Sequence, residues 1–208
     1  ESLQFGLCYN KSEREILERH REVLETMFFD VSVHEYDSID KLVVNSTLLC
    51  EWVKKEFGSK FDGKKISKLI LTSPEVVQSS FLRGVFSADG TCGDYKEGSS
   101  IRLGMSNEQF IRDVQAMLMN MGIDCCVSVS RSGRKNPKWS CHVRRQYITD
   151  YLELIGFQGQ KSVRGLSTAK LGKHSDLGFI RVKVRSVEEV GERTLWGLTV
   201  NNHAYVTN

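Results

Sequence analysis

The segment "FLRGVFSADG" (81–90) is an apolar, helix-forming stretch that ends on an acid and a glycine. A carboxylate at the C-terminal end of a helix opposes the partial negative charge there, so helix energetics alone would not select Asp89. A divalent cation would stabilise it, and Mg²⁺ prefers oxygen ligands. We therefore take Asp89, with Gly90 beside it, as a candidate metal site. The alternative is an ordinary helix end with a capping glycine.

Two small residues, Gly84 and Ala88, precede this acid and are four positions apart, which places them on one helical face. Small side chains let a second helix approach closely. If that second helix had the same form, two carboxylates would meet at the paired helix ends, where they would repel each other unless cations lay between them. Mg²⁺ held in this way assists phosphodiester hydrolysis.

The chain repeats one unit, which could position such a site. Segments 2–33 and 100–129 share the order strand, helix, strand, and the offset between the copies is 98 residues at both Ser2/Ser100 and Gly58/Gly156. We predict repeat one at 1–60 and repeat two at 78–157. The helix that leads repeat two has no counterpart in repeat one, because that position lies before Glu1. We expect the missing helix on a preceding stretch or on another chain.

Alternation and helical spacing predict the elements inside each copy. Apolar residues alternate with polar ones around Phe5 and Leu7 in one first strand, and around Ile101 and Leu103 in the other. Serines at 12 and 106 are predicted to cap the long amphipathic helices. Further strands are predicted at 31–36, 41–46, 126–131 and 139–144, and closing helices at 48–58 and 147–157.

Charge is unevenly distributed along the 208 residues, although the net charge is only +3. Residues 131–185 hold 13 Lys and Arg against 3 Asp and Glu, whereas the rest of the chain holds 16 against 23. A polyanion-binding surface needs such an asymmetry; a solvated basic face is the alternative. No long uncharged apolar run and no leader peptide is present, so we expect a soluble, cytoplasmic protein without a membrane partner.

The six cysteines form no C-x-x-C pair and have no histidine at zinc-ligand spacing. Disulfide and zinc sites are therefore disfavoured. We predict that the cysteines are small core residues.

The segment "LRGVFSADG" (82–90) resembles the name motif of the LAGLIDADG homing endonucleases. The resemblance implies an α+β fold of two pseudo-symmetric αββαββα halves, the first lacking its leading helix. It also implies that Asp89, with Gly90, binds Mg²⁺ at a shared site. "GKKISKLI" (63–70) is similar to the lysine block of intein-encoded members, in which Lys64 would assist the phosphate chemistry, with Lys65 as the alternative.

The same resemblance implies that each half lays a curved antiparallel sheet in the major groove of double-stranded DNA. Gln4 and Arg102, at equivalent positions of the two copies, are then the first candidates for DNA contacts. Strands can read base edges in that groove. The loop at 131–139 adds four basic residues that suit phosphate contacts better than base reading: Arg131, Arg134, Lys135 and Lys138.

The tail has the pattern of a different domain. A Gly/Ser/Lys-rich linker is predicted at 158–177, and alternating short strands at 178–208. The stretch from Leu198 resembles the C-terminal segment of the intein splicing (Hint) domain, in which His203 would assist Asn cyclisation. Gly197 departs from the usual Asp of that segment, and we expect Asn208 to be a truncation point.

These features lead to one hypothesis and two alternatives. The chain is predicted to be part of an intein-derived homing endonuclease, a monomer when complete, that makes Mg²⁺-dependent double-strand cuts at a long DNA site. Alone it should neither cleave nor splice, and it would need an N-terminal intein segment or a split partner. The alternatives are a catalytically inactive LAGLIDADG nucleic-acid-binding module, such as a transcription regulator or maturase, and a free-standing endonuclease.

Overall fold

The computed structural model describes residues 3–28, 30–58, 63–95, 98–130, 137–159, 186–189 and 191. The chain divides into a compact unit at 1–174 and a second unit at 175–208. Every helix and strand described below belongs to the first unit. The predicted splicing-like tail lies almost wholly outside the described residues, as does most of the predicted linker.

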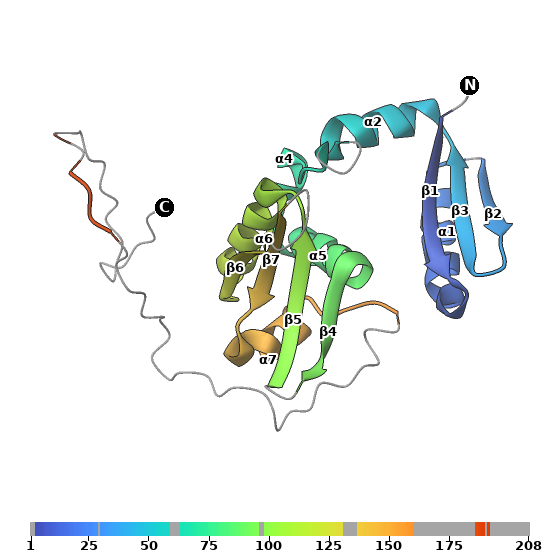
Figure 1. The fold of residues 1–208 in the computed structure, drawn as a ribbon. Coiled ribbons are helices and arrows are strands. Elements are labelled where there is room, and N and C mark those ends of the chain that lie inside the picture. The colour runs from blue at the N-terminus through green and yellow to red at the C-terminus, as the bar shows by residue number, and fades with distance from the viewer. Residues whose placement is uncertain are drawn as a thin grey trace. The chain divides into compact units, whose positions relative to one another are not determined.

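The first half is a three-stranded antiparallel sheet of order β1-β3-β2, covered on one face by a helix (Figure 1). A second helix leads away from the last strand. The elements are β1 (Gln4–Asn10), a 3-10 turn (Lys11–Glu13), α1 (Arg14–Glu25), β2 (Val31–Glu35), β3 (Ile39–Asn45) and α2 (Thr47–Phe57).

The second half repeats this plan with an additional leading helix and one more strand. Its antiparallel sheet has the order β4-β5-β7-β6. The elements are α4 (Lys68–Leu71), α5 (Glu75–Asp89), β4 (Gly90–Tyr95), β5 (Gly98–Met105), α6 (Glu108–Asn120), β6 (Cys125–Ser130), β7 (Lys138–Val143), a 3-10 turn (Arg145–Tyr147) and α7 (Ile148–Leu154).

The strand register confirms the internal repeat. Gly6 of β1 pairs with Val43 of β3, and Gly104 of β5 pairs with Ser140 of β7. β1 thus pairs with β3 in the same way as β5 pairs with β7, at an offset of about one repeat. Because side chains alternate between faces with a period of two, equal registers give equivalent faces in the two sheets.

Two hydrophobic cores of unequal size lie between sheets and helices. The larger buries Leu82 and Phe86 of α5 against β5 and α6, and the Phe86 ring centroid lies 5.2 Å from that of Tyr151 in α7. The smaller is built on Tyr9, Leu17 and Leu42. Burial of apolar area is the main stabilising term in such layers, so α5 and the second sheet form the most strongly packed part.

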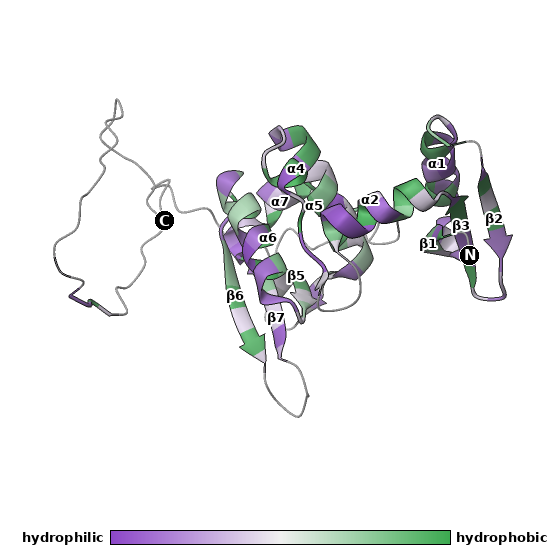
Figure 2. Ribbon diagram, turned by 90° about the horizontal axis from the view of Figure 1, so that it is seen from above, coloured by the Kyte–Doolittle hydropathy of each residue, from purple (hydrophilic) through white to green (hydrophobic). Residues whose placement is uncertain are grey.

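Polar and apolar residues alternate along the helices and strands (Figure 2). This pattern leaves each element with one side to bury and one side to expose. Among the residues that the structure describes, no helix is long and apolar enough to cross a membrane.

The predicted caps and cysteine positions need correction. The first long helix begins beyond a 3-10 turn capped by Asn10, whose Oδ1 accepts from the Ser12 N–H at 3.1 Å, and α6 is capped by Asn107 instead of Ser106. Asparagine serves as well as serine because its side-chain oxygen reaches the free N–H groups. Of the six cysteines, 92, 125 and 141 are buried, 50 is half-buried, and 8 and 126 are exposed.

We predict that Phe86→Ala destabilises the chain by about 3–5 kcal/mol, because it removes a fully buried ring and leaves a cavity beside Tyr151. Val76→Ala, at a position 71% exposed on the same helix, should change stability by less than about 0.5 kcal/mol. Urea unfolding followed by circular dichroism measures both. Equal costs at the two positions would contradict this account of the core.

Candidate functional site

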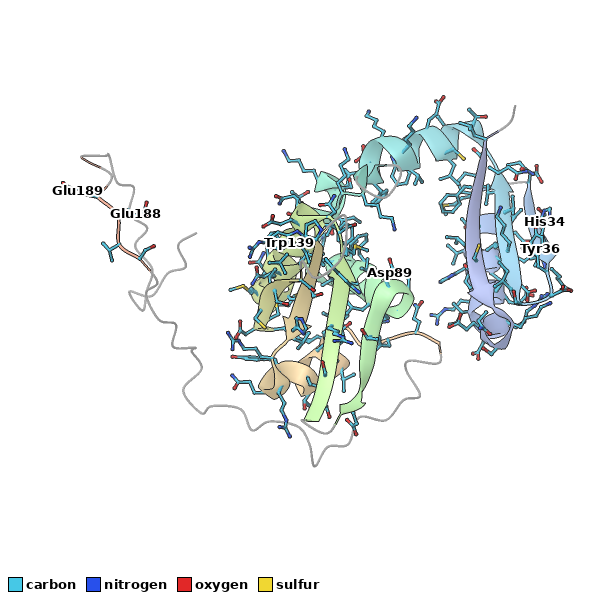
Figure 3. All side chains as sticks on the ribbon, viewed as in Figure 1. His34, Tyr36, Asp89, Trp139, Glu188 and Glu189 are labelled. Carbon is cyan, nitrogen blue, oxygen red and sulfur yellow. The ribbon has the colours of Figure 1, made fainter. Side chains whose placement is uncertain are left out.

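Asp89 is the last residue of α5 and is exposed, as the sequence predicted. Its position is fixed by its neighbours, since Leu82 and Phe86 anchor the helix and Gly90 begins β4 directly after it. The Gly90 N–H donates to the Phe86 carbonyl, and a methyl group on Gly90 would lie 2.5 Å from that oxygen. Figure 3 shows the Asp89 side chain at this junction. The glycine therefore permits the tight passage from helix to strand that presents the carboxylate.

The lysine block lies beside this carboxylate. Lys64, Lys65 and Asp89 line one cavity of about 540 Å³, together with residues of α2 and α5. The Lys64 carbonyl accepts from Asn107 Nδ2 at 2.7 Å, and the Lys65 N–H donates to the Phe57 carbonyl at 2.9 Å. The backbone of this segment is held at both residues, so the structure brings the predicted acid and the two candidate lysines together.

Gly84 and Ala88 form one side of the same cavity. They also line a second cavity of about 260 Å³ whose other walls include Leu7 and Tyr9 of β1. Both residues are exposed, and a methyl group on Gly84 would meet no atom within 4 Å. This side of α5 is therefore open at Gly84, and the approach of a second helix along it stays a prediction.

The residues at this site fit half of a divalent metal centre. The cavity lining contains one carboxylate, Asp89, and within the described residues no group of three or more His, Cys, Asp or Glu side chains could hold a metal ion. Mg²⁺ can use one or two carboxylates when phosphate oxygens and water complete its shell. Asp89 can contribute one such ligand, whereas the Gly90 carbonyl stays a predicted ligand.

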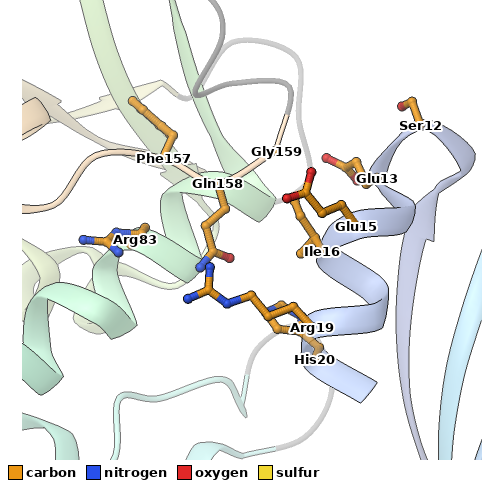
Figure 4. Close-up of a pocket in the computed structure, with 10 residues that line it drawn as sticks. All are labelled: Ser12, Glu13, Glu15, Ile16, Arg19, His20, Arg83, Phe157, Gln158 and Gly159. Atoms are coloured by element: carbon orange, nitrogen blue, oxygen red, sulfur yellow. The ribbon is translucent and has the colours of Figure 1, made fainter. Parts of the chain in front are cut away.

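A third cavity, of about 460 Å³, lies between α1 and the segment that follows α7 (Figure 4). The Arg19 and Gln158 side chains converge in it. At its edge the Tyr9 hydroxyl lies 2.7 Å from His20 Nδ1. Burial, followed by nearby Cys8 and Glu13, raises the pKa of Tyr9 to about 12, while burial and Arg19 lower the pKa of His20. Both groups are thus neutral near pH 7, and their bond ties β1 to α1.

The face of each sheet opposite its helix is termed here the outer face. On the first sheet, it carries Gln4, Gly6, Cys8, Asn10, Ser32, His34, Ile39, Lys41, Val43 and Asn45. On the second sheet, its described side chains are Thr91, Gly93, Ser100, Arg102, Gly104, Cys126, Ser128, Ser130, Lys138, Ser140 and His142. Among these strand residues none is an acid, although the chain contains 26 Asp and Glu.

The acids of the strands are on the other face. Asp40 is buried and paired with Lys11 at 3.2 Å and Arg14 at 3.4 Å, and Glu35 also contacts Arg14, at 3.0 Å. On the second sheet, Asp94 accepts from Ser99 Oγ at 2.6 Å. The register therefore sorts carboxylates onto the helix side and leaves the outer faces with basic and neutral polar groups.

The structure places three of the predicted DNA-contacting residues on these outer faces. Gln4 and Arg102 occupy equivalent positions, and Arg102 Nε lies 3.3 Å from Thr91 Oγ1. Lys138, assigned from sequence to a loop, is the first residue of β7. The other three loop residues and the splicing histidine lie outside the described residues: Arg131, Arg134, Lys135 and His203.

Three further outer-face residues were missed from sequence: Lys41, His34 and His142. The available signal was that each of these residues belongs to the polar side of a predicted strand. His142 Nε2 lies 3.2 Å from Ser128 Oγ, and His34 Nε2 lies 3.1 Å from Ser32 Oγ. Burial, followed by the charge of Arg102, lowers the pKa of His142 below its ordinary 6.5.

Comparison with known proteins identifies the fold. Residues 77–156 match the family of LAGLIDADG-like domains. Solved homing endonucleases superpose on it: I-DmoI in complex with DNA and Mn, with a TM-score of 0.58 at 14% identity, covering 74% of this chain and 81% of that one. I-WcaI bound to its DNA recognition sequence gives 0.54 at 10% identity, covering 79% and 75%. The predicted α+β LAGLIDADG fold is confirmed.

Relatives by sequence are much longer proteins. The chain is 28% identical over 197 residues to a DNA polymerase of Thermococcus litoralis, covering 89% of this chain and 12% of the polymerase. It is 26% identical over 186 residues to a glutamine–fructose-6-phosphate aminotransferase of Methanocaldococcus jannaschii, covering 84% of this chain and 16% of that protein. The chain thus spans less than a fifth of either relative.

Two glycine substitutions test whether a methyl group enters open space at Gly84 and collides with the backbone at Gly90. Gly84→Ala should stabilise the chain by about 0.5–1 kcal/mol, because alanine favours the helix and its methyl group enters open space. Gly90→Ala should destabilise it by more than this amount, because the methyl group collides with the Phe86 carbonyl. Thermal and urea unfolding measure both changes. A loss of stability in Gly84→Ala would contradict the open side of α5.

Proposed function

We propose that this chain binds double-stranded DNA through the outer faces of its two sheets. The supporting observation is the absence of acids from the described side chains of both outer faces, which carry Lys41, Lys138 and Arg102. Neutralising DNA phosphates with Lys and Arg releases counterions and drives binding. The polar serine, asparagine and glutamine side chains beside them suit hydrogen bonds to phosphates and base edges.

We further propose that the α5 end is half of a nuclease site for phosphodiester hydrolysis. Asp89 would supply one carboxylate to a divalent cation, and such a cation lowers the pKa of bound water and stabilises charge on phosphate oxygens. Lys64, across the same cavity, would hold the phosphate as a point charge, with Lys65 as the alternative. A second carboxylate would come from another helix of the α5 type, packed along Gly84 and Ala88.

The relatives support the proposal that this chain is an element inserted into longer host proteins. One segment, at most 16% of each relative's length, is shared with a DNA polymerase and an aminotransferase, whose own activities differ. A segment common to both proteins cannot be the part that performs either activity. We therefore propose an intein-derived endonuclease with a splicing domain, in which this chain alone neither cleaves nor splices.

A non-catalytic nucleic-acid-binding module is the second candidate. One observation favours it: the described residues supply a single carboxylate to the cavity. Such a module would use the outer faces in the same way and would not depend on Asp89.

Duplex binding and cleavage separate these functions. A labelled 30-base-pair duplex should bind this chain with a slope of log K against log[NaCl] of about −2.7 or steeper, which corresponds to three or more phosphate contacts. Asp89→Asn should leave this slope unchanged. In the protein extended upstream of Glu1 in its natural reading frame, the same substitution should abolish Mg²⁺-dependent double-strand cleavage of DNA.

Fluorescence anisotropy measures binding, and gel electrophoresis of a linearised plasmid library measures cleavage. The matched control is Asp113→Asn, which removes an acid from α6 far along the sequence from the site and should preserve both activities. Cleavage retained by Asp89→Asn would reject the nuclease assignment. A chain that fails to bind the duplex would reject the DNA-binding role.

Affinity for DNA should rise as the pH falls from 7.5 to 5.5. His142 is neutral at pH 7 because its pKa is lowered, and a nearby phosphate favours its charged form, so binding takes up a proton as the pH falls through that pKa. One histidine contributes up to about one unit of log K per pH unit. His142→Gln should lose this increment. Identical pH profiles for the two proteins would contradict a role for His142.

A further inference from the structure

Two lysines occupy matching positions across the two outer faces. Lys41 on β3 lies diagonally across from Gly6 on β1, two residues before its pairing partner Val43. Lys138 on β7 lies diagonally across from Gly104 on β5, two residues before Ser140. The repeat therefore places a lysine on β3 or β7 and a glycine on the paired strand, β1 or β5, in one register.

Each lysine lies over its glycine. A methyl group on Gly6 would be 2.6 Å from Lys41 Cε and 3.4 Å from its Nζ. A methyl group on Gly104 would be 2.5 Å from Lys138 Cε and 3.2 Å from its Nζ. The two distances to Cε are shorter than carbon atoms approach without a bond, whereas those to Nζ are close contacts. Alanine at either position would therefore displace the lysine stem from the sheet.

The glycines also determine where the ammonium groups of the two lysines lie. A lysine usually extends its ammonium group away from a protein surface into water. Here the missing Cβ lets the stem lie across the neighbouring strand, so the ammonium group of Lys41 lies over β1 and that of Lys138 lies over β5. β1 is an edge strand of its sheet and β5 is an internal strand, and in both sheets the charge is on the outer face.

No described acid of either outer face pairs with these ammonium groups. The strand carboxylates Asp40, Glu35 and Asp94 are all on the helix side. On that side Lys11 pairs with Asp40, and Arg14 pairs with Glu35. An ammonium group held over a polar face without a carboxylate on that face suits an anionic ligand that covers the face.

We propose that Lys41 and Lys138 are an equivalent pair of phosphate-contacting residues, and that Gly6 and Gly104 are positioning residues that hold them over the outer faces. This inference rests on the proposed binding of double-stranded DNA. It adds Lys41 to the interface and gives both glycines a role beyond the strand itself. A lysine ammonium acts as a point charge, which suits a phosphate oxygen.

A double-mutant cycle tests the pair. Lys138→Ala should lower the magnitude of the slope of log K against log[NaCl] by about 0.9, the value for one phosphate contact. Gly104→Ala keeps every charge and should still weaken binding, because it displaces the lysine. In the Lys138→Ala background, Gly104→Ala should have no further effect, since residues that act together are not additive.

The same cycle at Gly6 and Lys41 should give the same result, because the register is the same. Arg21→Ala removes one positive charge from α1, where Arg21 pairs with Glu25 on the helix side of the first half, and should leave the slope unchanged. Circular dichroism and thermal unfolding of each variant confirm that binding is compared between folded proteins.

The outcomes separate this inference from the proposed function. Duplex binding with an unchanged slope in both lysine variants would overturn the pair while leaving DNA binding in place. An equal cost of Gly104→Ala with and without Lys138 would overturn the positioning role of the glycine. Failure of the unmodified chain to bind the duplex would overturn the proposed function, and this inference with it.

Discussion

Burial of one side of α5 against the second sheet is the constraint on which the candidate site depends. Leu82 and Phe86 are fully buried, and Phe86 packs against Tyr151 of α7, so the helix can neither rotate nor slide without opening the core. This packing fixes where the helix ends. The close approach of Gly90 to the Phe86 carbonyl then turns the chain directly into β4. Asp89 is exposed at the end of α5 because burial of Leu82, Phe86 and Gly90 fixes the helix around it.

Strand register determines which side chains lie on the outer faces. A shift of one residue in β3 would bring Asp40 to the outer face and carry Lys41 to the core. The ion pairs of Asp40 with Lys11 and Arg14 oppose such a shift, because a buried carboxylate is costly without partners. Packing on the helix side thus determines the electrostatic character of the opposite face.

The sequence predicted the features that follow from period and repetition. Alternation predicted the described strands except β4 (Gly90–Tyr95), and the offset of 98 predicted the repeat. The apolar pattern before Asp89 predicted its position at a helix end, whereas its role as a metal ligand stays a prediction. The caps were misassigned by one or two residues, because Asn10 and Asn107 compete with the nearby serines for the same N–H groups. Lys41 was missed because its role depends on diagonal pairing between strands 30 residues apart, which periodicity within one strand does not reveal.

The small core of the first half lies beside the cavity that Gly84 and Ala88 line. In the described part of the first half, the smaller core buries Tyr9, Leu17 and Leu42, which is little apolar area for a sheet and two helices. Leu7 and Tyr9 face the cavity that Gly84 and Ala88 also line. An amphipathic helix seated there would cover apolar surface of the first half and pack against the small residues of α5. If it ended on an acid as α5 does, the same packing that completed the core would bring a second carboxylate to Asp89.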